Sequence, residues 1–270
     1  MQQLNKEEIK RLIPLYSGHI VQELEYAYSE EAPFGKVDMQ VHVDRADNPN
    51  TILILGGFAG TALYGDSENK EINQRIKMLI LDFFNRDGNN EKEIWLSLYS
   101  SNWESKIDEL FVENEKRKDN RLIHRLNLDK FSPHKNWQER VPSGYTVVKY
   151  DTSSTMFLDK RNWRDFWHPK SERFGWFLMK DGEAISECWS VWIEKIGVEK
   201  SCVEISVDTK EEFRRNGYAV ITSAAFIEDC LSRNLIPVWC CWQSTKGSMK
   251  LAEKLGFDVI ENRRAIFIKP

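Results

Sequence analysis

The stretch VEISVDTKEEFRRNGYAV, residues 203–220, is the part of the sequence that decides the expected fold. Its first six residues alternate, so Val203, Ile205 and Val207 share one face of a strand while polar side chains share the other. A polar loop follows, and from Tyr218 apolar residues return at the spacing of a helix with one buried face. A strand with a polar side, which faces solvent or lines a cleft, is therefore followed by a loop and an amphipathic helix.

The turn that opens this helix, with the pattern R-x-x-G-x-A, has the features of an anion site. Gly217 and Ala219 remove side-chain bulk where a ligand could approach the main chain. The N–H groups of a first helical turn point outward, and the helix dipole favours negative charge beside them. Arg214 and Arg215 add positive charge. The pattern alone is weak, because an ordinary helix start with exposed arginines also fits it.

The second half of the chain continues this alternation of strands and helices. Strands are expected at residues 145–150, 174–179, 185–192, 201–208 and 237–242, with Asp181-Gly182 as the tight turn between the second and the third. Helices are expected at residues 218–233 and 244–255, and a closing hairpin at residues 257–268.

The first half also mixes the two kinds of element. Helices are expected at residues 4–13, 16–27, 70–86 and 102–110, and strands at residues 37–43, 51–55 and 94–99. The glycine-rich residues 56–60 fit a turn between strands better than a phosphate loop, because the lysine and the Ser/Thr of a nucleotide motif are missing. Residues 129–144 contain Pro133, Pro142 and Gly144, which favour a linker. We therefore expect an N-terminal α/β domain at residues 1–135 and a second domain at residues 136–270.

Composition excludes several classes of protein. A chain of 270 residues with 41% hydrophobic residues has room for two modest domains with packed cores. The net charge of −4 argues against a nucleic-acid partner. The basic run from Lys116 to Arg125 is interrupted by Asp119, and a solvated loop or an edge strand is its expected form. No apolar stretch approaches the roughly 20 residues of a membrane span, so we expect no membrane association.

Cysteine usage bears on the compartment. The five cysteines are an odd number and include no C-x-x-C pair, so reduced thiols in a cytoplasmic protein are expected. The polar start of the chain does not resemble a signal peptide. His124, His134 and His168 have no partner at metal-ligand spacing, and no metal site is expected.

Residues 140–270 resemble the GNAT family of acetyltransferases. The R-x-x-G-x-A turn is similar to the pyrophosphate loop of that family, and Leu255-Gly256-Phe257 is similar to its helix-ending G-F. The whole chain resembles a bacterial subfamily of two-domain GNAT acetyltransferases, in which a diverged N-terminal half precedes the GNAT domain. The fold class implied is α+β, with a mixed, mostly antiparallel sheet whose fourth strand, residues 203–208, splays from the fifth, residues 237–242.

The resemblance implies acetyl-CoA as co-substrate, held in the gap between those two strands. The pantetheine arm would bond to main-chain groups of the fourth strand, and the pyrophosphate to N–H groups of the turn. The cofactor-binding residues implied in this way are Ile205, Ser206, Val207, Arg214, Arg215, Asn216, Gly217, Tyr218, Ala219, Thr245 and Ser248.

The reaction implied is direct attack of an amine on the thioester, which a carboxylate acting through water can assist as general base. Glu204 on the polar face of the strand is the expected base, although a solvent-facing or salt-bridged glutamate fits equally well; Glu187 and Asp208 are weaker candidates. The tyrosine that many family members carry in the last helix is replaced by Ala252, so the proton donor is unassigned.

Three functions stay open at this point. The first is acetylation of the primary amine of a small molecule, with the N-terminal domain contributing to the acceptor site or to a homodimer. The second is a catalytically weak acyl-CoA sensor, which the missing tyrosine suggests. The third is an aminoacyl or acyl transferase of the double-GNAT type, which would need a basic channel that the sequence does not offer.

Overall fold

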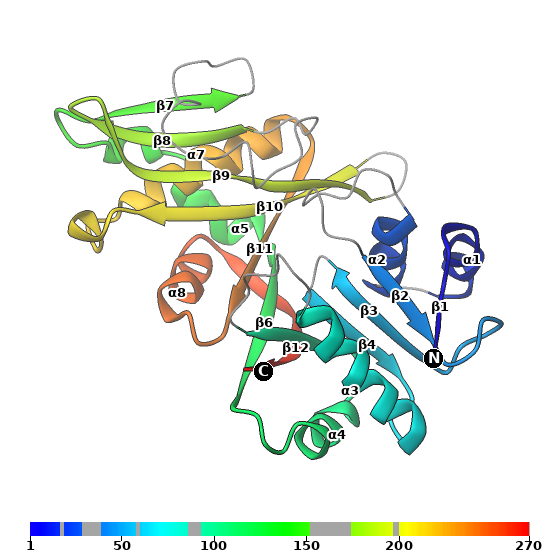
Figure 1. Ribbon diagram of the computed structural model, residues 1–270. Helices are drawn as coiled ribbons and strands as arrows, with labels where there is room; N and C mark the ends of the chain where they lie inside the picture. Colours follow the sequence, from blue (N-terminus) through cyan, green and yellow to red (C-terminus); the bar gives the residue numbers. More distant parts are fainter. Residues whose placement is uncertain are drawn as a thin grey trace. The chain divides into compact units, whose positions relative to one another are not determined.

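The computed structural model describes residues 1–16, 19–28, 39–57, 60–85, 93–151, 174–196 and 200–269 (Figure 1). Among these, residues 1–120 and 263–269 form one compact unit, and residues 121–262 form the other. The division falls inside two strands, β6 (Lys116–Leu126) and β12 (Phe257–Ile268), each of which contributes residues to both units. These units therefore differ in their bounds from the segments 1–135 and 136–270, whose separate roles stay a prediction.

The first unit is a sheet covered by helices on both faces (Figure 1). Its strands lie in the order β1-β2-β3-β4-β5-β12. The pair β4–β5 is parallel, and the pairs β1–β2, β2–β3, β3–β4 and β5–β12 are antiparallel. The strands are β1 (Gln2–Gln3), β2 (Gln40–Val43), β3 (Thr51–Gly57), β4 (Gly60–Gly65) and β5 (Ile94–Leu98). The helices are α1 (Lys6–Leu12), η1 (Ile13–Leu15), α2 (His19–Tyr28), α3 (Lys70–Phe84) and α4 (Trp103–Leu110).

The apolar run of β3 explains why this sheet has helices on both sides. Leu53 and Leu55 belong to the core that includes residues of α3 and α4, while Ile52 and Ile54 belong to the core that includes residues of α1 and α2. A strand buried on both faces reads as a continuous apolar segment instead of an alternating one. The sequence TILIL at residues 51–55 is such a segment.

The second unit has strand order β6-β11-β10-β9-β8-β7. Among its described residues, β10 and β11 pair in parallel, and the pairs β6–β11, β9–β10, β8–β9 and β7–β8 are antiparallel. The fold class is therefore α+β with a mixed, mostly antiparallel sheet, as predicted. Its further strands are β7 (Thr146–Asp151), β8 (Phe174–Lys180), β9 (Glu183–Ile196), β10 (Lys200–Thr209) and β11 (Leu235–Trp242). Its helices are α5 (Leu128–Phe131), η2 (Ser132–His134), η3 (Trp137–Arg140), η5 (Glu211–Phe213), α7 (Tyr218–Ser232) and α8 (Lys246–Lys254).

Helix α7 is the centre of the core of the second unit. The predicted stripe of Val220, Ala224 and Ile227 is buried, and Leu231 packs against the same cluster. The helix contacts β8, β9, β10 and β11, so it lies across the sheet (Figure 1). This packing fixes the start of α7 relative to the end of β10.

The two halves of the chain share one succession of elements and exchange their last strands. The first half runs β4-α3-β5-α4-β6 and the second runs β10-α7-β11-α8-β12, each beginning with a parallel strand pair. Residues 121–125 of β6 pair with β11 in the second unit. Residues 264–268 of β12 pair with β5 in the first unit. Each unit is thus completed by the final strand of the other half.

Two predictions about this region were wrong. Residues 257–268 form one continuous strand and not a hairpin, because β5 supplies hydrogen-bonding partners to its far end. The basic run is neither a loop nor an edge strand, since β6 lies between β12 and β11. Its charges are compensated by carboxylates: Lys118 pairs with Asp108, for example, at 2.6 Å.

Other predicted elements within the described residues are confirmed, with bounds that differ by at most four residues. Asp181 and Gly182 have φ angles of 50° and 79°, as a tight turn between β8 and β9 requires. Residues 17–18, 37–38 and 86, which belonged to predicted elements, and residues 58–59 of the glycine-rich turn lie outside the described residues. In the part of the chain that the structure describes, no helix has the length and apolarity to cross a bilayer.

Candidate functional site

The strands β10 and β11 are paired along only the first part of their length. They pair in parallel from Ser201–Leu235 to Glu204–Val238, and the pairing ends there although β10 continues to Thr209. The pairing of β10 with β9 also shifts register between Val203 and Ile205. Beyond Glu204, the edge of β10 that faced β11 has no neighbouring strand in the part of the chain that the structure describes, and its main-chain groups are available to a ligand.

A cavity of about 870 Å³ opens where the two strands separate. Its walls come from β10, the loop before α7, the first turn of α7, the end of β11 and one face of α8. The predicted site residues among its lining are Glu204, Ile205, Ser206, Val207, Arg214, Arg215, Gly217, Tyr218, Ala219, Thr245 and Ser248. The structure thus brings together all the predicted residues except Asn216, while their contact with CoA stays a prediction.

The loop before α7 presents main-chain donors to this cavity. Gly217 is the N-cap of α7 with a φ of 82°, and no side chain caps the helix. The first N–H groups of a helix lack the acceptors that later ones have. Among the described residues, the Val220 N–H donates to the Gly217 carbonyl oxygen at 3.0 Å, and the N–H groups of Tyr218 and Ala219 stay available. A Cβ at Gly217 would meet nothing within 4 Å, so the space in front of these donors is open. An uncapped helix start with free space in front of it fits an anion such as a diphosphate.

Two side chains of the loop hold its shape from within. The Asn216 Nδ2 atom donates to the carbonyl oxygens of Phe213 and Arg214, at 3.1 and 3.2 Å. The Arg214 Nε atom donates to the carbonyl oxygen of Thr209 at 3.0 Å. Arg215 adopts a φ of 64°, a left-handed conformation that a non-glycine residue takes only when its surroundings enforce it. Asn216 therefore holds the shape of the loop before α7, and Arg214 does so in addition to lining the cavity.

The corresponding helix start in the first unit is closed. The Asn69 Oδ1 atom accepts from the N–H groups of Glu71 and Ile72, at 3.1 and 3.2 Å, and so caps α3. Glu71 also places a negative charge in the first turn of the helix. A capped, acidic helix start repels an anion, so of these two helix starts the one that suits an anion is that of α7.

Glu204 sits at the point where the strands separate, and it is paired. It is 6% exposed, and its Oε1 atom accepts from the Arg121 Nη2 atom at 3.0 Å. Arg121 comes from β6, and its guanidinium carbon lies 5.2 Å from the centre of the Trp242 ring. Arg121 and Glu204 line the cavity. Of the two forms considered from the sequence, a solvent-facing and a salt-bridged glutamate, the structure has the salt-bridged one. The weaker candidate Asp208 also lines the cavity, whereas Glu187 does not.

Two of the hydroxyl groups near the site, those of Tyr218 and Ser248, have structural partners. The Tyr218 hydroxyl donates to the Tyr145 hydroxyl at 3.3 Å, and this hydrogen bond raises the pKa of Tyr218. The Ser248 Oγ atom accepts from Trp239 Nε1 at 3.0 Å, which fixes the indole at the cavity wall. Thr245 is the N-cap residue of α8 but makes no side-chain cap.

Ala252 lies outside the cavity wall. It is fully buried in the core of the second unit, while its neighbour Leu251 lines the cavity. A proton donor from the usual tyrosine position is therefore missing in this chain.

Several lining residues escaped the sequence analysis. Gly247, Lys250, Leu251 and Lys254 follow helical spacing, so the face of α8 shared with Ser248 could have been found from its periodicity. Arg121 carried no such signal, because it lies 83 residues before Glu204 on a strand of the other half of the chain.

Comparisons with known proteins agree with this geometry. The sequence model of the GNAT acetyltransferase family matches residues 25–265. The chain is 22% identical over 271 residues to the uncharacterized N-acetyltransferase YdfB of Bacillus subtilis (strain 168), covering 96% of this chain and 95% of that protein.

Solved structures show the same fold. A GCN5-related N-acetyltransferase-like protein from Streptococcus suis 89/1591 superposes with a TM-score of 0.63 at 22% identity, covering 97% of this chain and 98% of the other. A tandem GNAT protein from the clavulanic acid biosynthesis pathway has the same TM-score at 11% identity, covering 98% and 96%. The family match spans nearly the whole chain, and the resemblance seen in the motifs is confirmed: this chain belongs to the GNAT acetyltransferase family and is an acyltransferase.

Proposed function

We propose that this chain transfers the acetyl group of acetyl-CoA to the primary amine of a small molecule, by direct attack of the amine on the thioester. The observation that carries the proposal is the cavity between β10 and β11, which ends at the uncapped start of α7. One end of this cavity offers main-chain donors to a diphosphate, and the other end holds a carboxylate beside the parting strands.

Acetyl-CoA would be held mainly by main-chain groups. The unpaired edge of β10 at Ile205, Ser206 and Val207 suits an extended arm with amide groups, because it offers what a missing strand would have used. The N–H groups from Arg215 to Ala219 suit the diphosphate. Lys250 and Lys254 on α8 add positive charge to the same cavity.

The transfer itself needs one proton to leave the amine. The amine nitrogen attacks the thioester carbonyl carbon, the carbon–sulfur bond breaks, and its electron pair goes to sulfur as the CoA thiolate. The proton of the nitrogen passes to Glu204 through a water molecule. Glu204 thus acts as a general base, a role that carboxylates near a reaction centre can fill. Arg121 holds the glutamate side chain in place through the 3.0 Å hydrogen bond.

The thiolate does not require a dedicated acid. A thiol has a pKa near 8.5, so its anion is a tolerable leaving group at neutral pH. This agrees with Ala252 at the usual tyrosine position, since the reaction can proceed without a proton donor there. Ser206, Thr245 and Ser248 supply hydroxyl groups within the cavity wall.

A titration with acetyl-CoA, combined with thiol release over a panel of primary amines, tests the proposal. We expect one binding site per chain, because Asn69 closes the corresponding helix start in the first unit. Thiol release that depends on an amine is the expected result. Tight binding without turnover across the panel would favour an acyl-CoA sensor, and absence of binding would overturn both functions.

A further inference from the structure

Arg121 has hydrogen-bonding capacity that the described residues do not use. A guanidinium carries five N–H donors. Among the described residues, its side chain makes one hydrogen bond, from Nη2 to Glu204 at 3.0 Å. The side chain is 23% exposed and lines the cavity. Its remaining donors are thus available to an acceptor group that enters beside Glu204.

This position is far from the phosphate cradle. Glu204 and Thr209 are five residues apart on β10, which corresponds to about 17 Å along a strand. The loop with Gly217 follows after Thr209. An anion at Arg121 is therefore a different group from the diphosphate of CoA, and it lies where the acyl group and the amine would react.

We propose that Arg121 binds a carboxylate carried by one of the two reacting substrates, while Glu204 beside it accepts the proton of the amine through water. The inference rests on the proposed function and adds the chemical class of the substrate. A substrate without a carboxylate leaves the other donors of Arg121 unpaired in a partly buried site, which costs free energy. A substrate carboxylate pairs with those donors while the hydrogen bond from Arg121 to Glu204 stays in place.

The carboxylate has two chemical sources. An acceptor of the α-amino acid type carries amine and carboxylate on one carbon, and this matches neighbouring Glu204 and Arg121 side chains. A dicarboxylic acyl group, such as succinyl, carries the carboxylate on the donor side instead. Bidentate geometry favours arginine as the recognising residue in both cases.

Binding to the CoA-loaded full-length protein tests the acceptor source. The probes are N-acetyl amino acids with small, apolar, acidic and basic side chains. Each is compared with the N-acetyl amine that has the same side chain but lacks the carboxylate. At least one carboxylate is expected to bind about tenfold or more tightly than its decarboxylated partner, and Arg121→Gln should remove that ratio. The donor source is tested by titrating the free protein with succinyl-CoA and with acetyl-CoA. A preference for succinyl-CoA that Arg121→Gln abolishes assigns the carboxylate to the acyl group.

Matched variants separate recognition from folding. Arg125→Gln is the control, because Arg125 lies four residues further along β6, is exposed and does not line the cavity. Arg121→Lys should retain part of the preference for the carboxylate, since lysine keeps the positive charge but lacks the planar guanidinium that forms two hydrogen bonds to a carboxylate. The double variant Arg121→Gln/Glu204→Gln removes both members of the buried pair, and it replaces Arg121→Gln if the unpaired glutamate prevents folding.

The two proposals fail in different ways. Wild-type protein that does not bind acetyl-CoA contradicts the proposed function. Protein that binds acetyl-CoA but shows no carboxylate preference in either arm, or an equal preference in Arg121→Gln, overturns the role of Arg121 alone.

Discussion

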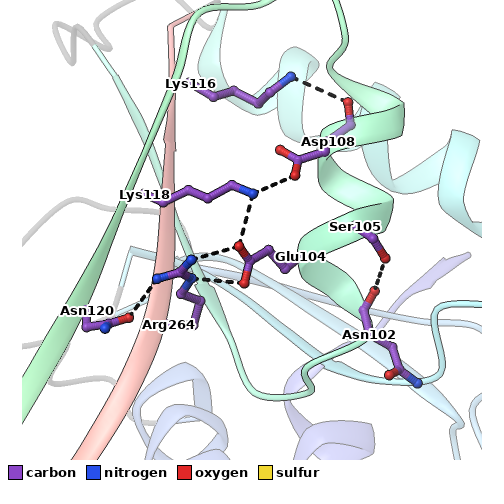
Figure 2. A network of polar contacts seen from close by, with 8 residues as sticks. All are labelled: Asn102, Glu104, Ser105, Asp108, Lys116, Lys118, Asn120 and Arg264. Atoms are coloured by element: carbon purple, nitrogen blue, oxygen red, sulfur yellow. Dashed lines mark hydrogen bonds and ion pairs between the residues drawn. The ribbon is translucent and has the colours of Figure 1, made fainter.

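Arg264, six residues from the end of the chain, donates from Nε and Nη2 to the two carboxylate oxygens of Glu104, at 2.9 and 2.8 Å. Figure 2 shows that Lys118 reaches the same carboxylate, and that Arg264 also donates to Asn120. These contacts join α4 to β6 and β12 within the first unit. They fix the exchanged strand through side chains as well as through main-chain pairing.

This network predicts a pH dependence of stability. Hydrogen bonds from Arg264 and Lys118 lower the pKa of Glu104 from 4.5 to about 2. The pKa is lower in the folded state, so the stabilisation is complete above pH 4.5 and is lost as the pH falls toward 2. We expect Glu104→Gln to reduce the free energy of unfolding by about 1 kcal/mol at pH 7, because a partly exposed network is screened by solvent. Urea unfolding at pH 7 and pH 3 measures the difference.

Glu113→Gln is the control for this variant, because Glu113 is exposed and has no ion-pair partner among the described residues. Its unfolding free energy should match that of the wild type at both pH values. An equal loss for Glu104→Gln at pH 7 and pH 3 would contradict the assigned role of the carboxylate.

Gly217→Asp should weaken acetyl-CoA binding by about tenfold or more, since a carboxylate at the start of α7 opposes a diphosphate. Gly144→Asp is the control for Gly217→Asp. Both glycines have a φ of 82°, and a Cβ at either would meet nothing within 4 Å, so the backbone strain is the same. Calorimetric titration of the two variants separates charge from strain. Equal affinity in both would remove the loop from the binding site.

Glu204→Gln should lower amine-dependent thiol release by about a hundredfold near neutral pH, the usual scale for loss of a general base. The affinity for acetyl-CoA should change little, because the loop proposed to bind the diphosphate, residues 214–219, lies elsewhere on the cavity wall. Glu187→Gln is the matched comparison, since Glu187 is 7% exposed against 6% for Glu204 and does not line the cavity. Steady-state kinetics with unchanged kcat in Glu204→Gln would exclude the proposed base.

Cys240 should react first with iodoacetamide, and acetyl-CoA should protect it. It is partly exposed and lines the cavity, while the other four cysteines are buried. Burial raises the pKa of Cys188 and of Cys230, which keeps those thiols protonated and unreactive. Peptide mass mapping after timed labelling gives the order. We expect protection of about threefold or more, and labelling that ignores acetyl-CoA would place Cys240 outside the binding path.

The fold of the second unit was largely readable from sequence because its signals are local. Alternation in β10, the helical stripe of α7 and the turn at Asp181 and Gly182 each involve neighbours in the chain. The cavity walls from β10, the loop and α7 follow directly from those elements. The pattern of a strand with polar residues on one face did not show that Glu204 would be buried.

The parts that sequence reasoning missed depend on distant segments. Residues 257–268 contain no strong turn signal, yet a hairpin was expected because a partner strand 166 to 174 residues earlier is invisible to local patterns. The charges of β6 suggested exposure, although carboxylates from α4 and β10 compensate Lys118 and Arg121. Periodicity describes how an element is buried and gives no information on which remote element covers it.

The exchange of final strands has a consequence for synthesis. The first half of the chain leaves the ribosome well before residues 264–268 are translated, yet β5 needs those residues as its neighbour. The first half therefore stays incompletely paired until residues 264–268 have been translated. The nascent protein cannot mature one domain at a time from its amino end, as many multidomain chains do. A chain that ended at residue 262 would contain the residues of the second unit, while β5 in the first unit would lack its β12 neighbour.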